Sequence, residues 1–150
     1  MKMGSSRNLI LFFLTILFLT CNLGCGKENP VDKLIPYVLV NFSINPNDIN
    51  YNNLNIPGNW TYVSGGYRGI ILFNAGFGDY KAYERTSPVN FPNDFECRVN
   101  VDESGLIAVD HCSASKFNLL DGYPFEGPAT LPLKQYQTYF DGQYLHVSNF

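Results

Sequence analysis

The spacing of short apolar runs between turn-forming residues is what most constrains the fold of this chain. From residue 37 onward, runs of about four to eight residues rich in β-branched and aromatic types alternate with clusters of Gly, Pro, Asn and Asp, which is typical of β-strands. No segment carries an apolar stripe repeating about every 3.6 residues, as an amphipathic helix would. The pattern therefore predicts an all-β domain. The expected strands are residues 37–44, 60–63, 69–73, 80–85, 97–101, 106–109, 135–140 and 143–147.

Two turns in this series have the composition of β-hairpins. The first is Asp102–Gly105, whose glycine can adopt the positive φ that such a turn requires. The second is the Asp141–Gly142 pair, a strong signal for a two-residue hairpin turn. We therefore expect antiparallel pairing on both sides of each turn.

The N-terminal segment has the organisation of a secretory signal. Lys2 and Arg7 precede an apolar run over residues 9–19, and two cysteines follow it. A basic start, an apolar run and a processing site are the parts of a signal peptide. The run of 11 residues is too short for a transmembrane helix, which needs about 20. We therefore predict that residues 1–24 are a signal peptide and lie outside the fold.

The cysteines after the apolar run resemble the processing site of a bacterial lipoprotein. Cys25 follows Gly24, and a small residue before the cysteine is typical of a lipobox, so Cys25 is the predicted acylated residue. Cys21 is the alternative, and a plain secretory signal without acylation is a third interpretation. Choosing Cys25 leaves Cys97 and Cys112 as an even pair, as expected in an oxidising compartment. An acyl anchor would hold the protein to a membrane without spanning it.

The rest of the chain divides into a tether and one domain. Residues 25–36 contain little to bury and are predicted to be a flexible lipidated arm. Residues 37–150, about 115 in number, are enough for one hydrophobic core. The net charge is −3 and no basic cluster is present, which argues against a nucleic-acid partner. The expected location is the bacterial cell envelope.

The second half of the chain resembles a Rieske domain. Residues 117–136, FNLLDGYPFEGPATLPLKQY, are similar to the family pattern of an aromatic, Asp-Gly, a Gly-Pro-Ala loop, Pro-Leu and Tyr. Residues 69–85, GIILFNAGFGDYKAYER, resemble the strands before its first cluster loop. The resemblance implies a small antiparallel β domain that carries a [2Fe-2S] cluster and transfers electrons, here in a Bacteroidetes-like lipoprotein.

The cluster ligands that the resemblance implies are absent from the matching positions. A Rieske cluster needs two thiolates on one iron and two imidazoles on the other, which the family supplies as Cys-x-His and Cys-x-x-His loops. The first loop matches Ser87 and Val89, and the second matches Asp110 and Ser113. We therefore predict that the domain holds no [2Fe-2S] cofactor and no other metal.

A shifted alignment does not restore the ligands. Moving the second loop by two residues places Cys112 at the thiolate position but Ser115 at the imidazole position. The chain has only two histidines, His111 and His146, and His146 lies outside both loops. The ligand count therefore excludes a conventional Rieske cluster.

The remaining cysteines bracket the Asp102–Gly105 turn. A two-residue turn would place Cys97 directly opposite Cys112, whereas a three-residue turn with a bulge would place Cys97 opposite His111. We predict a Cys97–Cys112 disulfide. A metal site made of Asp110, His111 and Cys112 is the alternative, but adjacent side chains of a strand point to opposite faces.

These residues favour a non-catalytic function. We expect a lipid-anchored envelope protein whose degenerate Rieske-like domain binds a partner protein or has a structural role, because function resides in the site rather than the fold. The alternative is an electron-transfer iron–sulfur protein, such as the ferredoxin subunit of an oxygenase or reductase. No Ser/His/Asp or paired-carboxylate motif brought together by the sequence itself argues for an enzyme.

Overall fold

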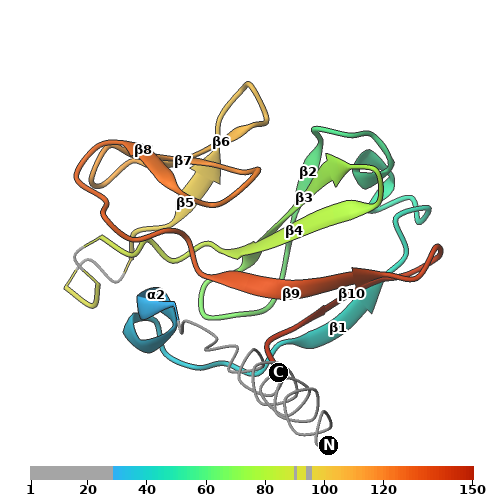
Figure 1. The fold of residues 1–150 in the computed structure, drawn as a ribbon, viewed down its shortest axis with the longest axis horizontal. Coiled ribbons are helices and arrows are strands. Elements are labelled where there is room, and N and C mark those ends of the chain that lie inside the picture. The colour runs from blue at the N-terminus through green and yellow to red at the C-terminus, as the bar shows by residue number, and fades with distance from the viewer. Residues whose placement is uncertain (1–28, 90, 94–95) are drawn as a thin grey trace, which may run out of the picture.

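Two antiparallel sheets make up the computed structural model, which describes residues 29–89, 91–93 and 96–150 (Figure 1). The larger sheet has six strands in the order β1-β10-β9-β4-β3-β2, and the smaller has four in the order β5-β6-β7-β8. The strands are β1 (Asn41–Ile44), β2 (Trp60–Val63), β3 (Ile70–Gly76), β4 (Asp79–Glu84), β5 (Val99–Val101), β6 (Ile107–Asp110), β7 (Ser115–Asn118), β8 (Pro124–Glu126), β9 (Gln135–Phe140) and β10 (Leu145–Ser148). The predicted all-β class is therefore confirmed.

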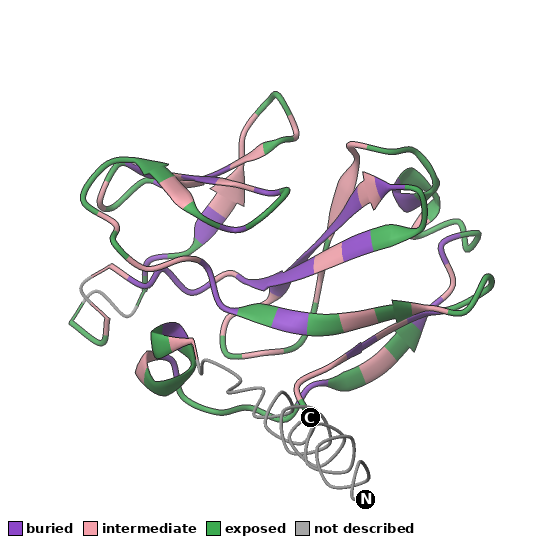
Figure 2. Cartoon of the chain, in the orientation of Figure 1, coloured by how far each residue is buried: buried purple, intermediate pink, exposed green. Residues whose placement is uncertain are grey.

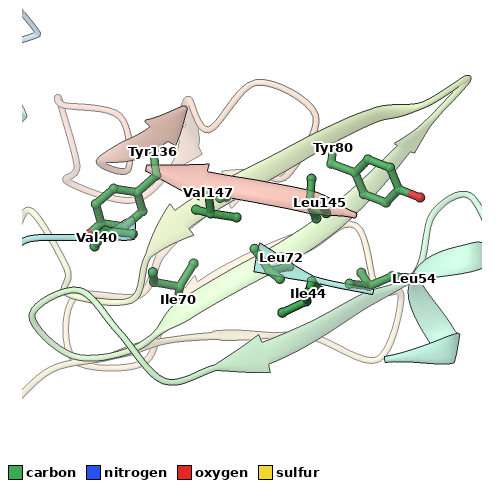
Figure 3. Packing of buried hydrophobic residues seen from close by; sticks show 10 residues of the cluster. Val40, Ile44, Leu54, Ile70, Leu72, Tyr80, Tyr136, Leu145 and Val147 are labelled. Carbon is green, nitrogen blue, oxygen red and sulfur yellow. The ribbon is translucent and has the colours of Figure 1, made fainter. Parts of the chain in front are cut away.

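The larger sheet bends back on itself and encloses the first core. The β4–β9 pairing, through Ala82 opposite Tyr136, joins the β2-β3-β4 half to the β1-β10-β9 half. The space between the halves is filled by apolar side chains from both. They are Val40, Ile44, Leu54, Ile70, Leu72, Tyr80, Ala82, Tyr136, Leu145 and Val147 (Figure 3).

The second core lies between the larger sheet and the smaller one. Side chains alternate along a strand, so Ile70 and Leu72 enter the first core while Ile71 and Phe73 enter the second. Strand β3 is buried on both faces, which explains its continuous apolar sequence (Figure 2). The second core consists of Ile71, Phe73, Tyr83, Val99, Ala108, Phe117, Leu119 and Leu133.

Two strands of the smaller sheet were not predicted from the sequence. Strand β7 has the sequence SKFN and β8 has the sequence PFE, so both are short and partly polar. Strand β8 lies at the sheet edge, where a proline costs no hydrogen bond within the ladder. The 3₁₀ turn η2 (Asn52–Asn55) was also unpredicted, because only Leu54 in it is buried.

The predicted flexible arm is wrong for its described part. Residues Pro30–Leu34 form a short helix, α2, with Asn29 as its N-cap and Pro30 in its first turn. Val31 and Ile35 lie one turn apart and are buried, with exposed fractions of 0% and 1%. Because these two side chains are removed from water, the segment is held against the domain rather than extended.

The predicted processing segment lies outside the residues that the structure describes. The predicted signal peptide (residues 1–24), Cys21 and Cys25 are all in this part, so their predicted roles stay predictions. Among residues 29–150 that are described, no helix is long and apolar enough to cross a bilayer.

A buried carboxylate fixes the loop between β2 and β3. Glu84 is 0% exposed and accepts hydrogen bonds from the backbone N–H groups of Tyr67 and Arg68, at 2.6 and 2.8 Å. It also accepts from the backbone and the hydroxyl of Thr86, at 3.0 and 2.9 Å, and from the Tyr136 hydroxyl at 2.7 Å. Burial, together with this bond to Glu84, raises the pKa of Tyr136, which keeps the phenol a neutral donor.

Removing the hydroxyl should change the free energy of unfolding differently at the two buried tyrosines, Tyr136 and Tyr83. Tyr136→Phe should lower the free energy of unfolding by about 1.5–3 kcal/mol, because a buried carboxylate loses a donor. Tyr83→Phe should be neutral or raise it by up to about 1 kcal/mol, because the buried Tyr83 hydroxyl has no hydrogen-bond partner among the described residues. Denaturant unfolding of both variants measures the difference. Equal destabilisation by both would contradict this account of the two hydroxyls.

Candidate functional site

Three of the four positions that the Rieske resemblance assigns to cluster ligands meet through hydrogen bonds at one end of the smaller sheet. Ser87 lies in the loop after β4, Asp110 ends β6, and Ser113 lies in the turn between β6 and β7. The hydroxyls of Ser87 and Ser113 both donate to Oδ2 of Asp110, each at 2.6 Å. The fourth position, Val89, is connected through its backbone N–H, which donates to Ser87 Oγ at 3.1 Å.

The same network reaches a third loop. The hydroxyl oxygens of Ser113 and Ser115 are 2.8 Å apart. Because a hydroxyl has one proton and that of Ser113 goes to Asp110, Ser115 is the donor in this pair. Ser115 Oγ in turn accepts the backbone N–H of Ala129 at 3.1 Å. Hydrogen bonds thus join the loop after β4, the β6–β7 turn and the Gly-Pro-Ala loop, which gather at the left of Figure 1.

Asp110 is the group on which this network ends. It is 1% exposed, and its Oδ1 accepts the backbone N–H of Cys112 at 2.9 Å. A buried carboxylate is stable only when donors replace the water it has lost. The hydroxyls of Ser87 and Ser113 and the amide of Cys112 supply these donors.

Gly127 allows the third loop to approach β7. Its φ is +88°, and a Cβ added there would lie 2.5 Å from the Cα of Ser115. Real Cβ atoms do not come this close to backbone, so only glycine fits. The Gly in the Gly-Pro-Ala sequence is therefore required for Ala129 to reach Ser115.

Cys97 and Cys112 form a disulfide, with their Cα atoms 6.1 Å apart. The β5–β6 register, with Val99 opposite Asp110, carries directly to Cys97 opposite Cys112. The turn between β5 and β6 is closed by a hydrogen bond from the backbone N–H of Asp102 to the carbonyl of Ile107, at 2.9 Å. Of the two predicted registers, the structure has the one that places the cysteines opposite each other.

This disulfide should contribute substantially to stability. Replacing both cysteines, as Cys97→Ala with Cys112→Ala, should lower the free energy of unfolding by about 3 kcal/mol, since a disulfide closing a loop of about 15 residues removes that much chain entropy from the unfolded state. Denaturant unfolding under oxidising conditions measures the effect. Addition of a reductant to the wild type should reproduce it, and a wild type insensitive to reductant would contradict it.

The donor set at this end of the sheet does not fit a [2Fe-2S] cluster. Such a cluster needs four thiolate or imidazole ligands, whereas these positions offer two hydroxyls, a carboxylate and a valine. Cys97 and Cys112 are joined to each other, so the shifted alignment fails as well. His111 is exposed, and His146 lies in β10 of the other sheet.

A shallow hollow lies beside the network. Its volume is about 200 Å³. It is formed by the loop after β4 and the Gly-Pro-Ala loop, and its lining residues are Pro88, Val89, Pro128, Ala129, Thr130 and Leu131. Five of the six lining residues are of apolar type, but backbone and hydroxyl groups make most of the surface exposed in the hollow polar, and Thr130 and Pro128 are exposed.

A second polar cluster was missed by sequence reasoning. Ser43 of β1 pairs directly with His146 of β10, and Ser43 Oγ lies 2.7 Å from Nδ1 of His146. Nε2 of the same ring lies 3.0 Å from Oδ2 of Asp141. Ser43 and His146 are 103 residues apart, so only the strand register could have revealed the group.

Ser43, His146 and Asp141 are arranged in the order of a Ser–His–Asp catalytic triad, but the cluster is exposed to solvent. The backbone N–H of Tyr144, the His146 side chain and the backbone N–H of Gln143 lower the pKa of Asp141 to about 2. The side chains of Asp141 and His146 are 34% and 44% exposed. Acyl transfer depends on a water-excluded site, so we assign this group to pairing of the β1, β9 and β10 strands rather than to catalysis.

Comparison with known proteins adds solved structures of low similarity. No family model and no curated protein matches the chain. The ferredoxin of carbazole 1,9a-dioxygenase from Nocardioides aromaticivorans is 17% identical, with a TM-score of 0.44, over 63% of this chain and 88% of that one. A Mycobacterium tuberculosis protein described as an NADH-dependent nitrite reductase small subunit is 19% identical, with a TM-score of 0.45, over 76% of this chain and 98% of that one.

Proposed function

We propose that this chain is a lipid-anchored protein of the bacterial cell envelope whose Rieske-like domain holds no cluster and acts as a non-catalytic binding module. The observation that supports the proposal most is the network at the former ligand positions. Ser87 and Ser113 direct their protons at the Asp110 carboxylate, so these positions hold one another through hydrogen bonds and offer iron no thiolate or imidazole.

Covalent and hydrogen-bonded links replace the role that a metal cluster would have in holding the loops. The Cys97–Cys112 disulfide joins the start of β5 to the β6–β7 turn, and the Asp110 network joins that turn to two further loops. Loops fixed before binding lose little conformational entropy when a partner docks. A rigid loop cluster around a shallow hollow is therefore suited to recognition of an envelope protein.

The anchor that this proposal assigns lies close to the domain. Cys25 is four residues before Asn29, the first residue that the structure describes. Four residues span at most about 14 Å, so acylation at Cys25 would hold the domain near the membrane surface. Acylation would thereby restrict the proposed binding module to partners at the same membrane.

Metal analysis tests whether the domain is cluster-free. Protein purified under anaerobic conditions should contain no stoichiometric iron or acid-labile sulfide and show no visible absorption band, because the ligand positions hold Ser87, Val89, Asp110 and Ser113. Incubation with ferrous iron and sulfide should not change this result. Bound iron with visible absorption would instead support the electron-transfer function.

A charge introduced at the hollow tests the binding surface. Thr130→Arg places a long cation at the exposed rim and should abolish partner capture by cross-linking in intact envelopes. Asn53→Arg makes the same charge change at exposed η2, at the far end of the molecule (Figure 1), and should leave capture unchanged. Capture that survives Thr130→Arg would show that the hollow is not the binding site.

A further inference from the structure

Three potential metal ligands lie together next to the Ser87–Asp110 network. The sulfur atoms of Cys97 and Cys112 and a carboxylate oxygen of Asp110 are all within 4.8 Å of one another. In a tetrahedral zinc site, with Zn–S near 2.3 Å and Zn–O near 2.0–2.2 Å, ligand atoms are about 3.5–3.8 Å apart. The three side chains are therefore within small movements of that geometry once the two sulfurs are no longer bonded.

The strand geometry explains which residues share this site. Asp110 ends β6, and Cys112 lies in the turn that follows it, where its backbone N–H donates to Oδ1 of Asp110; His111, between them, is exposed and is not part of the group. Cys97 reaches the group from the segment before β5, because it is bonded to Cys112. Of the sequence-based alternative of Asp110, His111 and Cys112, the structure brings together Asp110 and Cys112. Cys97 takes the third place in the group.

Asp110 retains capacity for one more interaction. An ionised carboxylate offers about four lone-pair positions. The described hydrogen bonds use two on Oδ2, from Ser87 and Ser113, and one on Oδ1, from the amide of Cys112. The remaining position on Oδ1 can accept a metal ion while the other bonds persist. Ser87 and Ser113 would then orient the ligating carboxylate, as outer partners do in metal sites.

We propose that Cys97, Cys112 and Asp110 form a zinc site in the reduced protein, with water as the fourth ligand. A thiol or dithiol reductant supplies two electrons, and the disulfide takes up two protons to give two thiols. The thiols release these protons when Zn²⁺ binds their sulfurs. Two thiolates, a carboxylate and one open position are a donor set that selects zinc over magnesium or calcium. The disulfide and the zinc site exclude each other, because both use the same sulfur atoms.

The site is accessible from solvent. Cys112 is exposed, whereas Cys97 is 8% exposed and Asp110 is 1% exposed. A reductant can therefore attack at Cys112, and the metal can enter by the same side. The inference goes beyond the proposed binding function and does not depend on lipidation or on the partner.

Zinc titration of the oxidised and reduced full domain tests the proposal. Protein reduced anaerobically with a phosphine, which leaves the disulfide open without competing as a thiol, should bind one Zn²⁺, and the oxidised protein none. Cobalt in place of zinc should give thiolate-to-cobalt charge-transfer absorption and the intense ligand-field bands of a tetrahedral site. Reduced wild-type protein without stoichiometric zinc would overturn the proposal.

Variants identify the ligands. Cys97→Ser and Cys112→Ser should each abolish stoichiometric binding and the charge-transfer band of their sulfur, and Asp110→Asn should weaken binding. Ser113→Ala should weaken it about tenfold, as loss of an outer partner does. His111→Ala is the matched control and should bind as wild type does, so loss of zinc in His111→Ala would contradict the assigned ligand set.

Folding is followed in every sample by circular dichroism. If reduction unfolds the apo domain, zinc should restore the native spectrum in the wild type and in His111→Ala but not in Cys97→Ser. Failure of zinc to bind or to refold reduced wild type overturns the site and leaves the cluster-free function untouched. Iron and sulfide uptake by the oxidised protein would contradict the proposed function instead.

Discussion

The burial of the Asp110 carboxylate is the constraint on which the loops at one end of the smaller sheet depend. A charge removed from water must be given donors, and here they come from separate segments: the loop after β4 supplies Ser87, and the β6–β7 turn supplies Ser113 and the amide of Cys112. Ser115 extends the network to the Gly-Pro-Ala loop. Three loops that share no strand are thereby held in one arrangement.

The same principle operates at Glu84, deeper in the fold. Its carboxylate is buried and takes donors from the β2–β3 loop, from Thr86 and from Tyr136 of β9. Glu84 and Ser87 flank one short segment, so two buried polar networks fix the chain where it passes from the larger sheet to the smaller. Strand β3 is buried on both faces and contributes side chains to both cores. The second core packs the smaller sheet against this strand and thereby positions its loops.

The sequence pattern predicted those elements whose formation depends on neighbouring residues along the chain. Alternating and continuous apolar runs predicted the long strands, and the turn at Asp102–Gly105 narrowed the cysteine pairing to two registers. The short strand β8 was missed because three residues carry no period, and α2 was missed because a five-residue helix shows no stripe. The Ser43–His146–Asp141 cluster could not be foreseen, since its partners meet only through the β1–β10 register.

The sequence by itself determined the all-β class and the side-chain chemistry at Ser87, Val89, Asp110 and Ser113, because strand periodicity and residue identity do not depend on long-range contacts. Only the tertiary structure decided what those residues do together. It placed Ser87, 23 residues from Asp110, within hydrogen-bond distance, and it chose the register that sets Cys97 against Cys112. Such contacts arise from chain packing, and no spacing along the sequence encodes them directly.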